Sequence, residues 1–585
     1  MRPLIAFLLL AAIGTAAPAQ IIRQPGAASA TGDTIFGNPV AEGHRAQAMF
    51  EQYRVQHLPT SRVSAPANCD ERVGSWCYWY DERPGPTEPK DIADSRSRLI
   101  GELDTLARQA PEDRWLSAQR VRYLTEAERP ADAVTAAKEC RTGGWWCDIL
   151  IGFALHMAGD DVHSDSTFSV ALSRMLPRDR CQWRDISMLV DDDTRQQYRR
   201  FGCDDPKRTA FEDRVWAFSR TLFSRPGNDT RTEWYSRMTM SLMLQDAASP
   251  HQNGFSDDER ELLLRFGWPR WWSRSPGRPS FGRGGRQGGG VDIISAEPVP
   301  AYRMVPAGFV LNNPSLSDSA NWRLHLPPVI GRYAPAYAKS LTPLEHQKAV
   351  FKRGDTALVV MAYDANVTKQ LAGAPVDAAL IVTPNSGAAD YGVIRRNTSR
   401  TGVLTAKAPW GPLLMSAEVS APSKGAVARA RYGANPPFSV GTRVTLSDLL
   451  FYKPYGSIPT TIEEAAPHAH PTERLRADEK LGVYWESYGT DPQGENIHIS
   501  LTVVKEVEES GFLRRQAKAL KLVREATPVS VAVNDMSARG SSVTQRALEL
   551  DVSTLRKGSY IVQLEVTVAG QYTVRADHRI EVITP

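Results

Sequence analysis

The chain lacks the features that mark several classes of protein. Its formal net charge is only +4 over 585 residues, so it has no basic excess of the kind that binds nucleic acid. Beyond the N-terminus no run of 18 apolar residues occurs, so we expect no integral membrane span after signal removal. With 42% hydrophobic and 23% charged residues, the composition is that of a folded chain of about four domains.

Motifs that carry chemistry are missing as well. The sequence has no G-x-S-x-G elbow, no H-E-x-x-H, no P-loop and no Rossmann fingerprint. It has no C-x-x-C pair for zinc or haem, so we expect no cofactor and no metal. Because catalytic groups also assemble from distant residues, enzymatic activity stays open, although we favour its absence.

The N-terminus carries the pattern of a signal peptide. Arg2 supplies a positive start, residues 4–13 form a short apolar run, and Ala17 to Ala19 provide small residues before Gln20. The apolar run is too short to span a bilayer. We therefore expect an exported protein of the periplasm or the extracellular space, whose mature chain begins near Gln20.

The cysteines agree with export. All six lie between Cys69 and Cys203, and an even number in an oxidising compartment favours disulfides. Six cysteines allow fifteen connectivities, so the nearest-neighbour pairing is a preference. The favoured pairs are Cys69 with Cys77, Cys140 with Cys147, and Cys181 with Cys203.

Residues 91–246 show helical periodicity, with apolar residues at steps of three and four. Helices opening at Trp115 and Trp146 are each followed by a break, at Pro130 and Gly159, and by a second helix. The offset of 31 residues between the tryptophans is close to that of a tetratricopeptide repeat. A short tetratricopeptide-like solenoid is favoured over a generic helical bundle.

After about residue 349 the apolar residues recur at every second position instead, and these short segments are separated by Pro, Gly and Asn. Asn435-Pro436-Pro437 separates two such sets, which predicts two β-sandwiches. The run Leu555 to Tyr560 resembles the start of an immunoglobulin-like strand whose tyrosine hydroxyl fixes a corner.

The predicted fold class is multidomain α + β, a helical region followed by two immunoglobulin-like β-sandwiches. The predicted segments are a signal peptide (1–19), an extended leader (20–60), a disulfide-stapled helical domain (61–250), a turn-strand-turn (251–274), a Gly/Arg-rich linker (275–292), a connecting segment (293–348), a first sandwich (349–437) and a second sandwich (438–585).

Several clusters have both a structural and a functional interpretation. The aromatic clusters beside cysteines are expected to pack in the core, with a sugar- or peptide-binding platform as the alternative. The pair His468 and His470 is expected in a surface loop, and residues 191–193 as an acidic turn or helix N-terminus. The aromatic residues are Trp76, Tyr78, Trp79, Tyr80, Trp145 and Trp146.

Residues 254–269 read Gly-Phe-Ser-Asp-Asp, then Glu-Arg-Glu-Leu-Leu-Leu-Arg-Phe, then Gly-Trp-Pro. This segment resembles the core of the bacterial GWxTD-domain proteins, in which Gly-Trp-x-Thr-Asp precedes an Arg-Gly-rich turn, an apolar strand and a Tyr-Gly-x-Pro turn. The matching residues are Gly254, Asp258, Gly267 and Pro269. The departures are Phe255 for the Trp, Asp257 for the Thr, and Arg260 for the turn Gly.

The resemblance implies an exported bacterial protein with tetratricopeptide-like helices before the motif and β-sandwiches after it. It implies no established enzymatic activity and no catalytic residue. From the residues themselves we expect a structural motif: a short strand over 261–266, an exit turn at Gly267 and Pro269, and Asp258 accepting backbone N–H bonds.

Two functions follow from these observations. We favour a non-catalytic binding or assembly module whose partner is a protein or a component of the cell envelope. The alternative is a hydrolase of envelope polysaccharide or peptide, with Glu463 and Glu464 as candidate acids and the tryptophans as platforms. That alternative requires two carboxylates in one cleft about 5–10 Å apart.

Overall fold

The computed structural model describes residues 37–60, 69–79, 85–276, 291–296, 302–322, 330–333, 335–436, 444–506, 529–568 and 572–583. The expected signal peptide, Tyr80, most of the Gly/Arg-rich linker and Pro437 lie outside these residues. All described helices and strands belong to the second of two units, Pro39–Pro585. None of the described helices is both long and apolar enough to cross a membrane.

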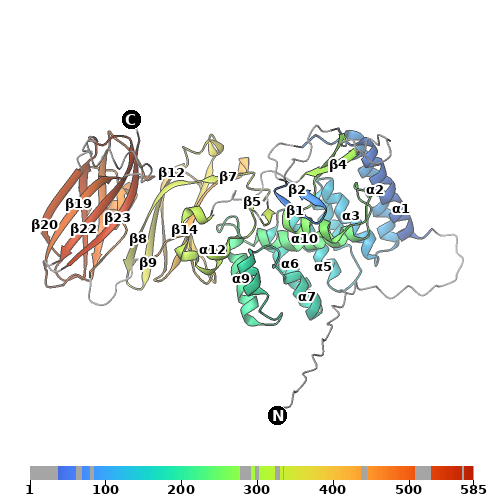
Figure 1. Ribbon diagram of the computed structural model, residues 1–585, viewed down its shortest axis with the longest axis horizontal. Coiled ribbons are helices and arrows are strands. Elements are labelled where there is room, and N and C mark those ends of the chain that lie inside the picture. The colour runs from blue at the N-terminus through green and yellow to red at the C-terminus, as the bar shows by residue number, and fades with distance from the viewer. Residues whose placement is uncertain are drawn as a thin grey trace, which may run out of the picture. The chain divides into compact units, whose positions relative to one another are not determined.

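The N-terminal half is helical and the C-terminal half consists mainly of strands, so the fold is of mixed α + β class (Figure 1). Side chains at the helix starts, such as Asp113 and Asn228, accept backbone N–H bonds and fix where helices begin. The helices are α1 (Pro39–His57), α2 (Lys90–Gln109), α3 (Arg114–Glu126), α4 (Pro130–Lys138), α5 (Trp146–Met157), α6 (Asp161–Arg174), α7 (Pro177–Arg184), α8 (Asp192–Tyr198), α9 (Pro206–Ser219), α10 (Asp229–Gln245) and α11 (Asp257–Phe266).

Helix α10 lies at the centre of the helical part. It contacts α3, α5, α6, α9 and α11, and nearly all of its side chains are buried, polar ones included. Two short hairpins accompany the helices: β1 (Glu71–Val73) with β2 (Trp76–Tyr78), and β3 (Trp271–Pro276) with β4 (Val291–Ala296).

The expectation of an extended leader up to residue 60 is wrong for 39–57, which form α1. Pro39 occupies its first position, where proline is favourable. Phe50 is buried in the helical core. Gly43, which resembles a helix breaker in the sequence, allows α1 to approach α3, since a Cβ there would come within 2.5 Å of the Leu116 side chain.

The expectation of a strand over 261–266 is also wrong, because these residues form the end of α11. Ser256 and Glu259 make a capping box, in which each side chain accepts the backbone N–H of the other residue. Leu263, Leu264 and Phe266 are buried, as expected for one face of a helix. The helix ends at Gly267, whose φ of +95° favours glycine.

The first β unit consists of two sheets around one apolar core. The larger has the order β11-β10-β13-β14-β7 and the smaller β12-β9-β8. The unit begins at β7, inside the expected connecting segment. The strands are β7 (Ser340–Pro343), β8 (Glu345–Arg353), β9 (Thr356–Asp364), β10 (Val376–Pro384), β11 (Tyr391–Thr398), β12 (Thr401–Pro409), β13 (Leu413–Ala421) and β14 (Ala426–Gly433).

The connecting segment before β7 holds β5 (Tyr302–Arg303), α12 (Gly308–Asn312) and β6 (Arg332–Tyr333). Strands β5 and β6 pair with each other in antiparallel fashion. The segment therefore has structure of its own.

The second β unit also has two sheets around its own core. Strand β18 pairs with β15, β16 and β21 in one sheet, and the other has the order β17-β23-β22-β19-β20. Tyr560 donates its hydroxyl to the carbonyl of Arg556 at 2.7 Å, as its motif predicted. The strands are β15 (Thr445–Leu446), β16 (Leu450–Tyr452), β17 (Arg474–Arg476), β18 (Lys480–Tyr488), β19 (Asn496–Lys505), β20 (Val529–Met536), β21 (Val543–Asp551), β22 (Gly558–Val568) and β23 (Tyr572–Ile583).

The two β units share a third apolar cluster, to which Phe351 of β8 and Tyr452 and Tyr484 of the second unit belong. Beside it Arg353 forms a bidentate ion pair with buried Glu486, at 2.7 and 2.8 Å. The second unit thus has its own core and also buries apolar surface against the first.

Candidate binding cavity

The sequence-predicted cysteines form three disulfides, Cys69–Cys77, Cys140–Cys147 and Cys181–Cys203. These are the nearest-neighbour pairs that the spacing favoured. Each closes a short loop within the helical part of the chain, and none lies among the residues of a cavity.

Of the aromatic residues beside the cysteines, Trp146 is buried, Tyr80 lies outside the described residues, and the others are half-buried: Trp76, Tyr78, Trp79 and Trp145. Trp146 is buried and lies against Trp145, whose ring also meets Trp183 edge-on. Tyr78 stacks on Phe266 with ring centroids 3.8 Å apart. These contacts agree with core packing rather than with an open platform.

The motif residues lie at and after the start of α11. Gly254 is exposed, and Phe255 packs against the helical core. Asp258 accepts the backbone N–H of Ser75 at 3.3 Å, so it contacts the turn between β1 and β2 rather than its own entry turn. Gly267 and half-buried Pro269 follow the helix.

The remaining polar candidates are tied into local structure. Asp191 caps α8 and also accepts the N–H of Gly308 at 2.6 Å. His468 stacks on Tyr455, whereas His470 is buried and bonded to the carbonyl of Thr472, so the expectation of a surface loop is wrong for His470.

Glu463 lies in the short helix α13 (Ile462–Ala465). Glu464 of the same helix accepts the backbone N–H of Thr460. Within the described residues no group of three His, Cys, Asp or Glu is placed to hold a metal.

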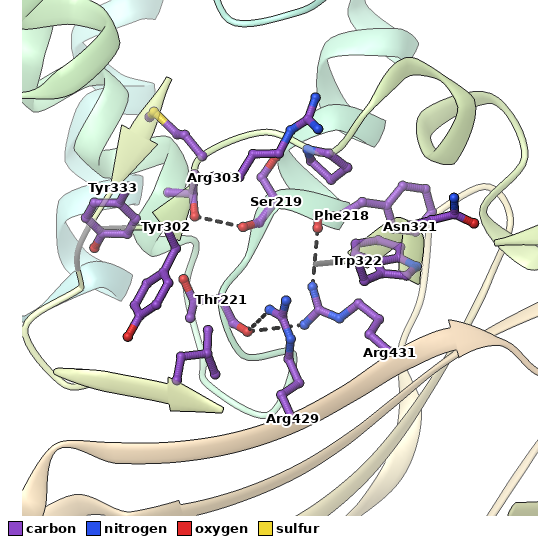
Figure 2. A pocket seen from close by; sticks show the side chains of 14 residues that line it. Phe218, Ser219, Thr221, Tyr302, Arg303, Asn321, Trp322, Tyr333, Arg429 and Arg431 are labelled. Carbon is purple, nitrogen blue, oxygen red and sulfur yellow. Dashed lines mark hydrogen bonds between the residues drawn. The ribbon is translucent and has the colours of Figure 1, made fainter. Parts of the chain in front are cut away.

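A cavity lies where the helical part, the connecting segment and the first β unit meet (Figure 2). Its empty volume is about 480 Å³, including solvent at its mouth. Its wall combines aromatic, aliphatic and arginine side chains and contains no Asp or Glu. The lining residues are Phe218, Ser219, Thr221, Thr230, Tyr302, Arg303, Met304, Pro306, Asn321, Trp322, Tyr333, Leu341, Arg429 and Arg431.

Strand β14 places two arginines side by side in this wall. Because side chains alternate along a strand, Arg429 and Arg431 point to the same face, while Ala428 and Ala430 face the core of the first β unit. Both arginines donate to one acceptor, the carbonyl of Thr221, at 2.7 and 3.3 Å (Figure 2).

Arg431 is held by a complete set of contacts. It donates to Ser416 Oγ (3.1 Å), to the carbonyl of Arg220 (3.0 Å) and to Glu418 Oε1 (3.4 Å). Its guanidinium also lies 3.6 Å from the centre of the Phe223 ring. A guanidinium with this many partners is a fixed part of the wall.

Glu418 is the carboxylate buried beneath the two arginines. It lies opposite Arg429 in the register of β13 and β14, yet its oxygen contacts Arg431. It also accepts the backbone N–H groups of Phe223 (2.7 Å) and Ser224 (3.0 Å). Burial, and next the charge of Arg429, lower the pKa of Arg431 well below its usual range.

Arg303 approaches the cavity from β5. Its Nε donates to the carbonyl of Val305 at 2.8 Å. Burial lowers its pKa, and the negative charge of Asp191 opposes that effect. The cavity thus gathers three guanidinium groups from two elements that are distant in the sequence.

A buried network lies behind Tyr333 and resembles a catalytic triad. His156 Nδ1 is 2.9 Å from Thr232 Oγ1, and His156 Nε2 is 2.8 Å from Glu233 Oε2. Thr232 is fully buried, however, and is not among the cavity's lining residues, so no substrate reaches it. The network is a charged core of α5, α6 and α10.

Little in the sequence indicates the cavity. The alternation of Ala and Arg over 428–431 predicts a strand with arginines on one face, but such a face is normally in solvent. Trp322 and Tyr302 come from a segment without clear periodicity. Only the fold brings residues 218–221 onto this face of β14.

Comparison with known proteins adds little. No family model matches the chain, and no curated protein matches it. Red sea bream transglutaminase is similar over 42% of this chain and 32% of its own, at 12% identity and a TM-score of 0.14. A Bacteroides uniformis β-glucuronidase is similar over 38% and 26%, at 7% identity and a TM-score of 0.15. The chain spans less than a third of either protein, and at these TM-scores neither match indicates fold or function.

Proposed function

We propose that the chain is an exported bacterial envelope protein that acts as a non-catalytic binding module, and that its ligand occupies the cavity beside β14. One observation carries this proposal: a cavity, open to solvent, whose described wall residues include three arginines and four large aromatics but no Asp or Glu. Such a wall can recognise a ligand, but it supplies no carboxylate pair for glycoside hydrolysis.

Several finer statements belong to the same proposal. The consecutive pairs α3 with α4 and α5 with α6 support tetratricopeptide-like hairpins. The hydroxyl bond of Tyr560 supports an immunoglobulin-like sandwich. The residues Gly254, Asp258, Gly267 and Pro269 support membership of the GWxTD-domain family, and the disulfides and N-terminal sequence support export.

The two function classes predict different results with envelope material. The purified exported chain is incubated with insoluble envelope polysaccharide carrying its peptides, and both co-sedimentation and soluble products are measured. We expect saturable co-sedimentation without release of sugars or peptides. Release of products that depends on the chain would contradict the proposal and support the hydrolase.

A variant that narrows the cavity tests the site. Asn321 lines the cavity and is exposed, so Asn321→Trp introduces a large side chain at its wall. Exposed Asn496 of the second β unit lines no part of this cavity, and Asn496→Trp is the matched control. We expect Asn321→Trp to abolish co-sedimentation and Asn496→Trp to leave it unchanged; equal binding by both variants would place the site elsewhere.

A further inference from the structure

We propose that the cavity binds the oxyanion of its ligand, a carboxylate or a phosphate attached to an organic body, that Arg429 donates to it, and that Arg303, on the opposite side of the cavity, adds positive charge (Figure 2). This inference rests on the proposed binding function and names the ligand class of the same cavity.

Charge balance is the first argument. Arg429 and Arg431 are placed on β14 with one neighbouring carboxylate, Glu418, between them. Glu418 already accepts two backbone N–H groups and the hydroxyl of Ser416. Arg429 therefore contacts no carboxylate of the described residues directly, although the charges of Glu418 and Asp229 act on it. A partly buried guanidinium of this kind is stabilised by an anion in contact with it.

Unused hydrogen-bond donors are the second argument. A guanidinium has five N–H groups. Among the described residues, Arg429 donates only through Nη1, to Thr221, and Arg303 only through Nε, to Val305. No described residue accepts a hydrogen bond from the other N–H groups of these two side chains. A guanidinium can bind a carboxylate or phosphate through two parallel bonds.

The rest of the wall indicates the organic body. Tyr302, Trp322 and Tyr333 line the cavity together with Met304 and Leu341. Trp322 uses its indole N–H to bond Ser317, which fixes the ring in the wall. An aromatic and aliphatic wall gains free energy from apolar contact, so an oxyanion with a ring or hydrocarbon body fits better than a bare ion.

Calorimetric titration of the full chain tests this inference. The probes are phenyl phosphate, benzoate and inorganic phosphate, each at constant ionic strength set with chloride. We expect one saturable site, with an organic oxyanion binding more tightly than inorganic phosphate. The tighter of phenyl phosphate and benzoate identifies phosphate or carboxylate as the group recognised.

Three variants of equal charge change locate the site. Arg429→Gln is expected to weaken binding at least about ten-fold, which corresponds to one lost charge-assisted contact, and Arg303→Gln is expected to weaken it less, through the lost charge alone. Exposed Arg395 of β11 lines no part of the cavity, and Arg395→Gln is expected to leave the affinity unchanged. Melting curves of all three variants test whether each is folded. If Arg429→Gln does not fold, the affinity of Arg303→Gln for the probes tests the site instead.

The outcomes separate this inference from the proposed function. Absence of saturable binding by every probe, or equal affinities of the native chain and both cavity variants, overturns the oxyanion site. If Asn321→Trp still abolishes co-sedimentation in that case, the binding module stands and recognises another chemistry. If oxyanions bind but envelope material does not, the cavity stands and the envelope function fails.

Discussion

Two buried arginine clusters of this protein differ in how their charges are balanced. Between α1 and α3, Arg54 donates to Glu126 at 2.6 Å and Arg122 donates to the same carboxylate at 3.1 Å. On β14, Arg431 reaches one carboxylate at 3.4 Å and Arg429 donates only to a carbonyl. In the first cluster every arginine named has a close carboxylate, whereas in the second cluster Arg429 has none among the described residues.

The difference separates a structural role from a binding role. Arg96 and Glu51 complete the helical cluster, where acids and bases are interleaved, and none of these residues lines the cavity beside β14. In the helical cluster the donors without a hydrogen-bond partner, such as Arg54 Nε, are buried, whereas the arginines of β14 line an open cavity. Buried arginine alone does not indicate function, whereas buried arginine in excess of its carboxylates, in a cavity wall, indicates an anion site.

The largest effect is expected from Glu126→Gln in the helical cluster. The change removes the carboxylate that Arg54 and Arg122 contact most closely and leaves them only Glu51, at 3.5 Å from each. Breaking such a buried pair costs about 3–5 kcal/mol. Urea unfolding measures the loss. Glu139, half exposed and bonded to Arg120, is the control, and Glu139→Gln is expected to cost under about 1 kcal/mol. Equal losses would contradict a structural cluster.

A pH effect of about 3 kcal/mol is expected from the network around His156. Burial alone would lower its pKa, but hydrogen bonds to Asp161 and Glu233 and their charges outweigh it and raise the pKa to about 9. A raised folded pKa stabilises the protein fully below the unfolded value of about 6.5, and this contribution is lost as pH rises through 9.

The check is unfolding free energy between pH 6 and about 10. His156→Gln should remove most of the decline. Exposed His163 pairs with Asp160 on the surface, and His163→Gln should retain it. A native chain with constant stability across this range would contradict the charged network.

A smaller loss, about 2 kcal/mol, is expected from Glu418→Gln. The amide oxygen can still accept the N–H of Phe223, but the carboxylate charge beside Arg431 is lost. Because the positive excess then grows, the affinity for phenyl phosphate should rise. Denaturation measures the loss of stability, and titration of the same sample measures the affinity for phenyl phosphate. Weaker anion binding by Glu418→Gln would contradict the charge-balance argument.

The smallest effect is expected from Arg429→Gln without ligand. The change removes a charge that shares the Thr221 carbonyl with Arg431, so lost bonding and relieved repulsion offset each other to within about 1 kcal/mol. Thermal unfolding in chloride measures it. A loss as large as that of Glu126→Gln would assign Arg429 a structural role and remove the contrast between the two clusters.

The sequence predicted well what depends on local spacing. The three disulfide pairs and the helices within residues 91–246 both follow from neighbours in the chain. The prediction of a strand over 261–266 is wrong because it did not use a local signal for a helix start. Ser256 followed by Glu259 is a capping box visible in the sequence, and it predicts the helix that forms.

The cavity could not be predicted in this way. Thr221, Trp322 and Arg429 are about a hundred residues apart from one another, and no periodicity links them. Likewise the apolar cluster between the β units joins Phe351 to Tyr484, although each segment alone predicts an independent domain. Both features arise when preformed units pack against each other.

The most direct test of the account is a crystal of the full chain soaked in selenate, a tetrahedral oxyanion whose selenium is located by anomalous scattering. The account predicts an anomalous peak in the cavity, with a selenate oxygen within about 3 Å of a guanidinium nitrogen of Arg429. Selenate bound only at other surfaces, with the cavity holding none, would contradict it.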